Sequence, residues 1–448
     1  MMIVKKFLLL FLILAVCSSG KSPSKSFSPV VAQFIGGYEQ LNIPGFTYDY
    51  REYFSSIPDV DALNGQEDFF AKEKSLLNNY DRASIKEEDL VDYDQMNYEI
   101  DFNLRRIALE KQWMNDGRKI PSGGLHKLSN YSEWYSFFVK KYTSTDITPE
   151  EVYKLGESEV ARVKPEIKRI QLQLGFSDSI AFYEFLKSDT FYITDKQKVV
   201  DRFEVIDQTV RKHLSGFVGN VDLPPVYPME WPDAGPNTPP GIYLNRENNS
   251  YGKDVFQYNF YGGRYNWRAM EWLYMHEAIP GHHLQFSFRN LYRSNDSLQQ
   301  LFFYSGNAEG WACYVEYFGK EMGLYKDPYS ELGKWEWDLV RSARLVIDVG
   351  IHYYGWTHEQ ALEYWKKTIP GQDEIAEREV TRVSNWTAQA LSYKVGADFI
   401  FKLKEKCKQE EGASYDEKKF HRTYLSFGMG PLEIIEKNFQ QVYSEQKS

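Results

Sequence analysis

Hydrophobic residues recur at helical spacing along most of the chain from about Phe34 onward, so the pattern predicts a mainly helical fold. One helix start is marked by Thr148, which can cap the helix, by Pro149 at the first helical position, and by Glu151, which completes a capping box. The apolar periodicity that follows stops at Gly175, a residue that commonly ends helices.

A second capping box, formed by Thr357 and Gln360, predicts another helix start. The segment 224–240 breaks the helical pattern, because its seven prolines exclude a regular helix. After it, residues 242–244 and 255–258 have the composition of short strands. The pattern as a whole predicts a mainly α fold with a small antiparallel sheet just before the histidine-rich segment of the chain.

The N-terminus is typical of an export signal. Lys5 and Lys6 precede an apolar run over residues 7–16, which is too short to span a bilayer as a mature helix. The Leu-Ala-Val-Cys sequence ending at Cys17 is similar to a lipobox, in which the cysteine becomes the lipidated first residue. Ordinary cleavage near Gly20 is the alternative.

These features predict an exported protein of the periplasm or cell envelope. Residues 1–20 are expected to form a signal peptide of ordinary or lipoprotein type, and the Ser-, Lys- and Pro-rich residues 21–32 a tether. Residues 33–448 are expected to fold as a single domain, with two lobes around a cleft as the alternative arrangement.

Composition excludes some classes of function. The net charge is −10 and no basic stripe is present, which argues against nucleic-acid binding. Aromatic residues make up 16% of the chain, which suits an aromatic-lined cleft or an aromatic-rich core equally well. Only Cys313 and Cys407 follow the leader, so the chain is not a disulfide scaffold. The apolar, helical surroundings of Cys313 favour a buried free thiol.

Three of the eight histidines lie close together in the sequence: His276, His282 and His283. Imidazole is a common zinc ligand, and a catalytic zinc takes three protein ligands plus water. Glu277 adjoins the first histidine and is placed to act as general base on a metal-activated water, as in the zincin His-Glu-x-x-His helix. The cluster therefore predicts a zinc site rather than histidines without a metal.

The spacing of these histidines does not fit a straight helix. His276 and His282 are separated by about 600° of helical rotation, roughly 120° off the same face. His283 returns to nearly the same face, but a rise of roughly 10 Å is too long for bonds of about 2 Å to one zinc. Because Pro280 lacks an N–H and Gly281 tolerates unusual backbone angles, we expect a bulge or kink here. It would make His282 the ligand, with His283 as the alternative.

A third ligand is expected from Glu309, which lies at the start of a later helical run, as the downstream carboxylate does in thermolysin-like sites. Glu316 lies further along the same run on about the same face. It is either a carboxylate that orients a ligand histidine or an ordinary surface residue. The predicted ligands of one Zn²⁺ are thus His276, His282 and Glu309.

The segment 276–285, His-Glu-Ala-Ile-Pro-Gly-His-His-Leu-Gln, resembles the signature of the DUF885 family, a zincin-like group of metallopeptidases that are often exported. Further blocks that begin at Thr148, Glu309, Asp348 and Gln389 resemble this family in the same order. The resemblance covers nearly the whole mature chain and implies a zincin- or gluzincin-like, bilobed helical fold.

The chain departs from the family pattern at positions that flank the expected site. Thr387 and Ala388 stand where the family tends to have Pro-Gly, Val383 stands where an aromatic is usual, and Val349 replaces a usual Thr. None of these residues is an inferred ligand. The departures therefore bear on substrate positioning more than on metal binding.

Four further residues are candidates for roles beside the metal. His352 and Tyr393 lie in family-like blocks and are candidates to stabilise an oxyanion, with packed core residues as the alternative. Arg382 is a candidate to bind a substrate carboxylate. Asn245 follows the first expected strand and is a candidate to hydrogen-bond the substrate backbone.

These expectations describe a zinc-dependent hydrolase that cleaves peptide bonds, with residues 33–448 as its catalytic domain. Glu277 would take a proton from the metal-activated water and pass it to the leaving amine. Two alternatives stay open: a zinc hydrolase of non-peptide amides or esters, and a lipid-anchored binding or scaffold protein that keeps the metal without turnover. Expected partners are peptide substrates, and the membrane only through a lipid anchor at Cys17.

Overall fold

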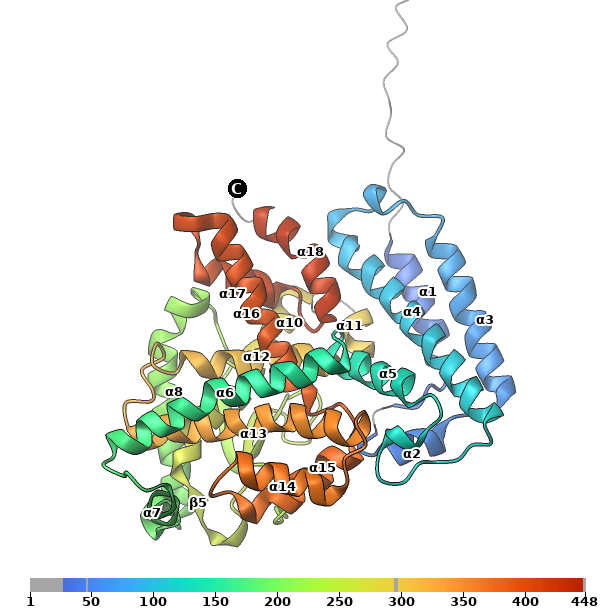
Figure 1. Ribbon diagram of the computed structural model, residues 1–448. Coiled ribbons are helices and arrows are strands. Elements are labelled where there is room, and N and C mark those ends of the chain that lie inside the picture. Colours follow the sequence, from blue (N-terminus) through green and yellow to red (C-terminus); the bar gives the residue numbers. More distant parts are fainter. Residues whose placement is uncertain (1–26, 46, 294–296, 446–448) are drawn as a thin grey trace, which may run out of the picture.

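Helices account for most of the computed structural model, which describes residues 27–45, 47–293 and 297–445 (Figure 1). The expectation of a mainly helical chain is confirmed. The signal peptide and most of the tether lie outside the described residues. Residues 28–32 were expected to belong to the tether, but they form the start of helix α1, in whose first turn Pro29 is well tolerated.

The N-terminal helices pack together on one side of the molecule (blue to teal in Figure 1). Their aromatic and aliphatic faces form one hydrophobic cluster, in which Phe34, Phe70 and Trp134 are fully buried. The helices are α1 (Ser28–Glu39), α2 (Tyr50–Ser56), α3 (Val60–Leu77), α4 (Glu87–Asn115) and α5 (Tyr131–Thr143).

A second helical group surrounds the long helix α13, along which α6 packs (Figure 1). Both predicted capping boxes are confirmed: Thr148 caps α6 with Glu151, and Thr357 caps α14 with Gln360. The helices of this group are α6 (Pro149–Gln173), α7 (Ser179–Phe185), α13 (Pro328–His352), α14 (His358–Thr368) and α15 (Ala376–Asn385).

The third group contains the histidine-rich segment and the C-terminal helices. Within it, α12 and α16 approach closely because glycines face each other: a Cβ added to Gly310 would lie 2.5 Å from the Cα of Gly396. The helices are α8 (Lys196–Val218), α9 (Met270–Glu277), α10 (His282–Arg293), α12 (Ser305–Val315), α16 (Leu391–Glu411), α17 (Glu417–Ser426) and α18 (Leu432–Glu445). Helix α11 (Ser297–Leu301) packs instead against α1, and its Leu298 belongs to the N-terminal cluster.

Two small sheets lie beside this group. The predicted strands are confirmed as β3 (Gly241–Leu244) and β4 (Asp254–Tyr258), which pair antiparallel. The expectation of a purely antiparallel sheet is wrong, because β2 (Val226–Glu230) from the proline-rich segment pairs parallel to β4. Proline is tolerated there because β2 is an edge strand. The second sheet pairs β1 (Tyr192–Ile193) with β5 (Tyr265–Asn266).

Short 3₁₀ helices connect many of these elements. They are η1 (Arg82–Ser84), η2 (Leu125–Lys127), η3 (Asp189–Phe191), η4 (Tyr261–Gly263), η5 (Trp267–Ala269), η6 (Glu316–Phe318), η7 (Asp373–Ile375) and η8 (Gly412–Ser414). The connection that matters for the site is η6, which directly continues α12.

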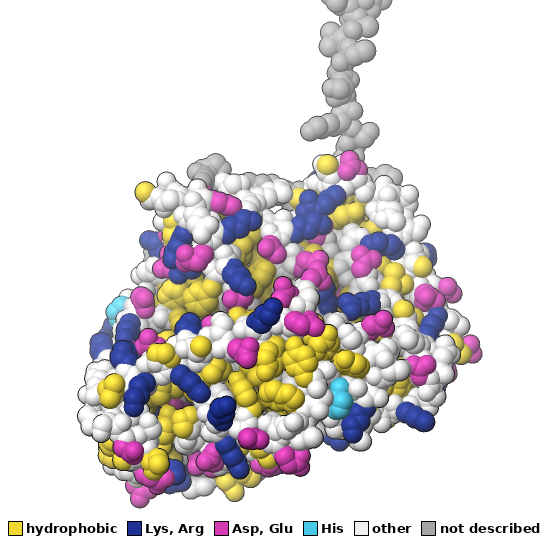
Figure 2. Space-filling view, in the orientation of Figure 1, with side chains coloured by type: hydrophobic (Ala, Val, Ile, Leu, Met, Phe, Trp, Pro, Cys, Tyr) yellow, Lys and Arg dark blue, Asp and Glu magenta, His cyan; other side chains and the backbone are white. Residues whose placement is uncertain are grey.

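Many of the chain's aromatic residues are used in its core. The largest fully buried side chains include Trp134, Trp272, Trp311 and Trp365, together with several tyrosines. On the face shown in Figure 2, side chains of both charge signs are interspersed rather than gathered by sign. None of the helices in the described ranges combines the length and apolarity that a membrane span requires.

Candidate metal centre

The helix that carries the histidine cluster is interrupted, as the spacing predicted. Helix α9 ends at Glu277 and α10 begins at His282, with non-helical backbone angles at Ala278 (φ −104°, ψ −107°). Only glycine fits at position 281, because a Cβ there would lie 1.9 Å from the backbone carbonyl oxygen of His276. The break turns the chain sharply, so that residues at the end of α9 and the start of α10 meet.

The break brings three of the predicted residues together. His276 Nε2 lies 3.3 Å, and His282 Nε2 3.6 Å, from Oε2 of Glu309. All three ligand atoms lie within 4.8 Å of one another. The three residues come from α9, α10 and α12, and their side chains are 5%, 12% and 18% exposed, so the group is largely enclosed.

The donor set and its unmet polar atoms fit a metal ion. Two imidazoles and one carboxylate are the ligands of His₂Glu catalytic zinc sites, which keep a further position open. Among the described residues, His282 Nδ1 and Glu309 Oε2 are buried without a hydrogen-bond partner. Buried polar atoms are normally paired, so an unpaired atom between two imidazoles is the arrangement expected where a cation belongs.

Electrostatics at the group point the same way. Burial raises the pKa of Glu309, but the neighbouring His276 and His282 outweigh it and hold that pKa well below its usual range. Burial lowers the pKa of His276, yet its contacts with Cys313, Glu309 and Glu316 raise that pKa well above its usual value. Glu309 is therefore held in its charged form, and a positive charge beside it balances that charge. Either a proton on a histidine or a bound metal ion can supply the positive charge.

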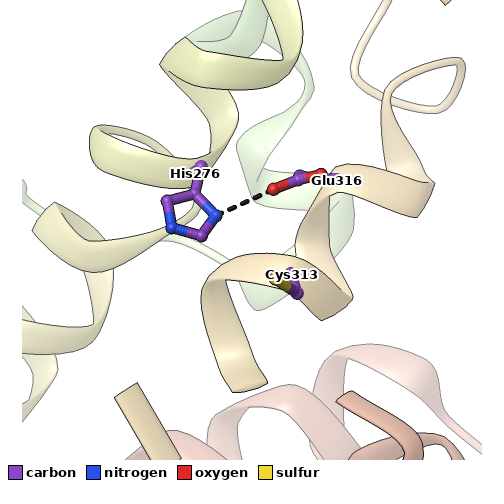
Figure 3. A group of neighbouring side chains, drawn as sticks. All are labelled: His276, Cys313 and Glu316. Atoms are coloured by element: carbon purple, nitrogen blue, oxygen red, sulfur yellow. Dashed lines mark hydrogen bonds and ion pairs between the residues drawn. The ribbon is translucent and has the colours of Figure 1, made fainter. Parts of the chain in front are cut away.

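The other ring nitrogen of His276 faces a buried pair of charges. Nδ1 lies 2.8 Å from Glu316 Oε1, the contact drawn in Figure 3. Arg341 Nη1 donates to both oxygens of Glu316 at 2.7 Å, and Nη2 lies 3.3 Å from His276 Nδ1. Glu316 is therefore not a surface residue; it is 1% exposed and fixes the orientation of the His276 ring.

His276, Cys313 and Glu316 form a second, fully buried group whose ligand atoms also lie within 4.8 Å, a candidate metal-binding triad in its own right. Figure 3 shows Cys313 on the same helix as Glu316, one turn earlier, below the imidazole. Burial raises the pKa of the Cys313 thiol, which disfavours the thiolate that metals bind. Cys313 is a buried free thiol, as the sequence predicted, and so is Cys407.

Glu277 lies beside the ligand group and against the sheet. Its Oε2 accepts a hydrogen bond of 2.8 Å from the backbone N–H of Tyr243 on β3. Since β3 is an edge strand, its outer backbone groups face Glu277 rather than another strand. Glu277 as a whole residue is 7% exposed and follows His276 at the end of α9.

His283 and Asn245 do not join the ligand group. His283 is fully buried, with Nδ1 3.2 Å from the Tyr243 hydroxyl and Nε2 2.9 Å from the carbonyl oxygen of Pro224. Both ring nitrogens are thus engaged, so the structure does not support His283 as the alternative ligand. The side-chain oxygen of Asn245 accepts from the backbone N–H of Glu247 at 2.6 Å, which ties that oxygen into its own turn.

The structure also separates the two oxyanion candidates. The Tyr393 ring stacks on His276, with ring centres 6.3 Å apart and an interplanar angle of 18°. His352 lies at the far end of α13, eleven positions beyond Arg341 or roughly 16 Å along the helix. It is fully buried, contacts the carbonyl oxygen of Val383 at 3.1 Å, and burial lowers its pKa to about 4. His352 is a packed core histidine and cannot reach the site.

Several residues of the site were missed from the sequence. Cys313 is one helical turn after Glu309, a spacing that could have been noticed. Arg341 and Arg344 reach the site only through the packing of α13 against α9, and no local pattern marks them. Gln389 opens a family-like block just before α16, but nothing local indicates its contact with the site.

A cavity of ≈ 260 Å³ lies alongside the N-terminal half of α9. It is lined partly by aromatic rings, among them Tyr265, Trp272 and Trp337, the last two of which lie 5.2 Å apart. Trp272 precedes His276 by one helical turn on the same face. The aromatic residues therefore serve both the core and a cavity beside the start of α9, which none of the three candidate ligands lines.

Fold and site together define a mainly helical protein with a candidate metal centre at a break between two helices. The chain belongs to the family described as "Bacterial protein of unknown function (DUF885)", whose model matches residues 129–439. This confirms the resemblance given by the histidine block. No curated protein is similar enough to count as a match.

Solved structures share the fold, and two of them are described as putative lipoproteins. One, from Colwellia psychrerythraea, has a TM-score of 0.66 at 22% identity over 94% of this chain and 74% of its own. The other, from Shewanella oneidensis and of unknown function, has a TM-score of 0.72 at 16% identity over 94% of this chain and 100% of its own. At these identities the likeness shows the fold alone.

Proposed function

We propose that this protein is a zinc-dependent hydrolase of peptide bonds, with His276, His282 and Glu309 as the zinc ligands. The observation that carries the proposal is the convergence of these three side chains, with Glu309 Oε2 buried between the two imidazoles and without a hydrogen-bond partner. In this proposal the helical body is a zincin-like fold, and β3 is the strand beside its metal centre.

The alternative triad through Cys313 is less suited to a cation. A metal ion bound on the Nδ1 side of His276 would face the Arg341 guanidinium, which already occupies both oxygens of Glu316. Repulsion between two cations in a buried site is strong. On the Nε2 side the facing group is the Glu309 carboxylate, so the cation is attracted rather than repelled.

The chemistry follows from the residues around the group. When bound, zinc polarises a carbonyl oxygen and lowers the pKa of a water molecule. Glu277 is placed to accept a proton from that water and to return it to the leaving amine. Tyr393, stacked on His276, is placed to donate a hydrogen bond to the developing oxyanion. Glu316 holds the His276 ring in the orientation that presents Nε2.

The test combines metal content with turnover. Purified wild type should carry about one zinc per chain and cleave members of a mixed peptide library. Glu277→Gln should keep the zinc and lose roughly 10²-fold or more in kcat. Glu247→Gln, a more exposed carboxylate in the turn after β3, is the matched control and should retain both. Wild type without stoichiometric zinc would overturn the proposal.

The same library separates the remaining alternatives. Turnover confined to esters or non-peptide amides would make the protein a zinc hydrolase of another class. Zinc retained without any turnover would make it a binding or scaffold protein, which has no need of a base at Glu277. Each of these outcomes overturns the peptide assignment while leaving the metal centre in place.

The location of the protein is the second part of the proposal. Two proteins of the same fold are described as putative lipoproteins, and the leader of this chain ends in a lipobox-like sequence at Cys17. We therefore propose that the mature protein is exported and lipid-anchored through Cys17. Incorporation of labelled palmitate should be lost in Cys17→Ser. A wild type that takes up no label, and is released after ordinary cleavage, would refute the anchor.

A further inference from the structure

Three arginines surround the ring of Tyr393 next to the candidate metal centre. The guanidinium carbons of Arg341, Arg344 and Arg382 lie 5.6, 5.8 and 6.0 Å from the ring centre. Three cations this close together repel one another unless carboxylates neutralise them. An arginine without a carboxylate partner is therefore the one whose positive charge is available to a ligand.

Two of these arginines are matched by buried carboxylates. Arg341 donates to both oxygens of Glu316 at 2.7 Å, and Arg344 Nε donates to Glu379 at 2.8 Å. Arg382 differs: its guanidinium donates to a neutral amide oxygen at 2.6 Å, and within the described ranges no carboxylate lies at ion-pair distance from it. Its side chain is only partly buried, so a ligand can reach it.

That amide belongs to Gln389, which links Arg382 to the metal side of the site. Gln389 accepts from Arg382 and also hydrogen-bonds to Tyr393, whose ring stacks on His276. Trp386 lies under the guanidinium, 5.3 Å from its central carbon, and limits its movement. Arg382 is thus a positioned cation rather than a freely moving surface one.

We infer that Arg382 binds the free C-terminal carboxylate of a peptide substrate, which makes the protein an exopeptidase that removes one or two residues from the C-terminal end. This inference rests on the proposed function. Arginine suits the role because its planar fork binds a carboxylate through two parallel hydrogen bonds.

The distances favour a short released fragment. The Arg382 guanidinium carbon lies 6.0 Å from the Tyr393 ring centre, which lies 6.3 Å from the His276 imidazole, so the guanidinium can be no further from the imidazole than these two distances together. One or two extended residues span about 3.5 to 7 Å. Two extended residues, with a metal bond of about 2 Å and a hydrogen bond of about 2.8 Å at their ends, can reach nearly across this largest possible span, so a fragment of one or two residues fits between the two groups without a looped backbone.

Binding is tested first, without turnover, in the zinc-loaded Glu277→Gln protein. Calorimetry compares N-acetyl-tetraalanine ending in a free carboxylate with the same peptide ending in an amide. The free acid should bind about 10- to 100-fold more tightly, the range of a charge-assisted hydrogen-bonded contact. Adding Arg382→Gln should bring the two peptides within threefold, and Arg382→Lys should keep part of the preference.

The matched control is Arg202→Gln, which removes an arginine stacked on Trp267 at 4.7 Å, away from the ligand group. It should leave the preference unchanged, and thermal unfolding checks that each variant is folded. Digests of a longer peptide by wild type, followed by mass spectrometry, should show loss of one or two C-terminal residues.

The two ways of failing are distinct. If wild type cleaves internal bonds and the acid and amide bind equally, the inference is overturned and the proposed function stands. A preference that disappears equally in Arg202→Gln also overturns the inference. If wild type cleaves no peptide while the acid still binds preferentially through Arg382, the proposed function is overturned and the carboxylate site stands.

Discussion

Replacing Glu316 by Gln tests how the protein orients its histidine ligand. The carboxylate contacts His276 Nδ1 at 2.8 Å and Arg341 at 2.7 Å. Both contacts are buried, since Glu316 is only 1% exposed. Gln keeps the shape of the side chain but removes its charge. The imidazole then loses a charged acceptor, and a buried guanidinium loses its counterion.

The magnitude follows from these two losses. Removing a partner that orients a ligand histidine typically weakens metal binding 10- to 100-fold, or about 1.4 to 2.7 kcal/mol. Leaving Arg341 buried without a carboxylate costs about 3 to 5 kcal/mol of folding free energy. The double variant Glu316→Gln/Arg341→Met removes the uncompensated cation, so it should recover much of the stability while zinc binding stays weak.

Zinc affinity is measured by competition with a fluorescent chelator, and stability by urea unfolding followed by circular dichroism. The reasoning is refuted if Glu316→Gln, shown to be folded, binds zinc within twofold of wild type. It is refuted in another way if Cys313→Ser alone abolishes stoichiometric zinc while His282→Ala does not. That pattern would place the ion on the Nδ1 side of His276, with Glu316 as a direct ligand.

Three further substitutions test the backbone and the buried charges. Gly281→Ala should abolish zinc binding and lower the melting temperature, because its Cβ would overlap a backbone oxygen; Gly36→Ala, with open space around it, should do neither. Ala388 has φ +62°, so Ala388→Gly should raise the free energy of unfolding in urea by about 1 kcal/mol, whereas Ala390→Gly, at φ −61°, should lower it. Burial raises the pKa of Glu99 to about 7. The contribution of protonated Glu99 to the free energy of unfolding is therefore fully present below pH ~4.5 and is lost as pH rises through 7. Glu99→Gln should therefore flatten the decline in unfolding free energy between pH 5 and 8 by up to roughly 3 kcal/mol, and a profile identical to wild type would contradict the raised pKa.

Local features of this fold could be predicted because their causes are local. The helix starts at Thr148 and Thr357 depend on side chains three positions apart, and the structure confirms both. The interruption at Pro280-Gly281 followed from helix geometry together with the local properties of proline and glycine. The departure at Ala388, where the family tends to have Gly, coincides with a left-handed backbone angle that only glycine adopts without strain.

Features that depend on packing between distant segments could not be predicted. Whether His352 lay in the site or in the core was decided by where the end of α13 packs, and it lies in the core. Arg341 shares that helix but faces His276, because it lies in the middle of α13. The parallel pairing of β2 was hidden by its proline content, which marks an edge strand as readily as a loop.

The most direct test of the central claim is X-ray absorption at the zinc edge of the zinc-loaded protein. Ligation by His276, His282 and Glu309 predicts nitrogen and oxygen neighbours at about 2.0–2.2 Å, with imidazole scattering from two rings and no sulfur. A sulfur neighbour at about 2.3 Å would place the metal at Cys313 and contradict the account.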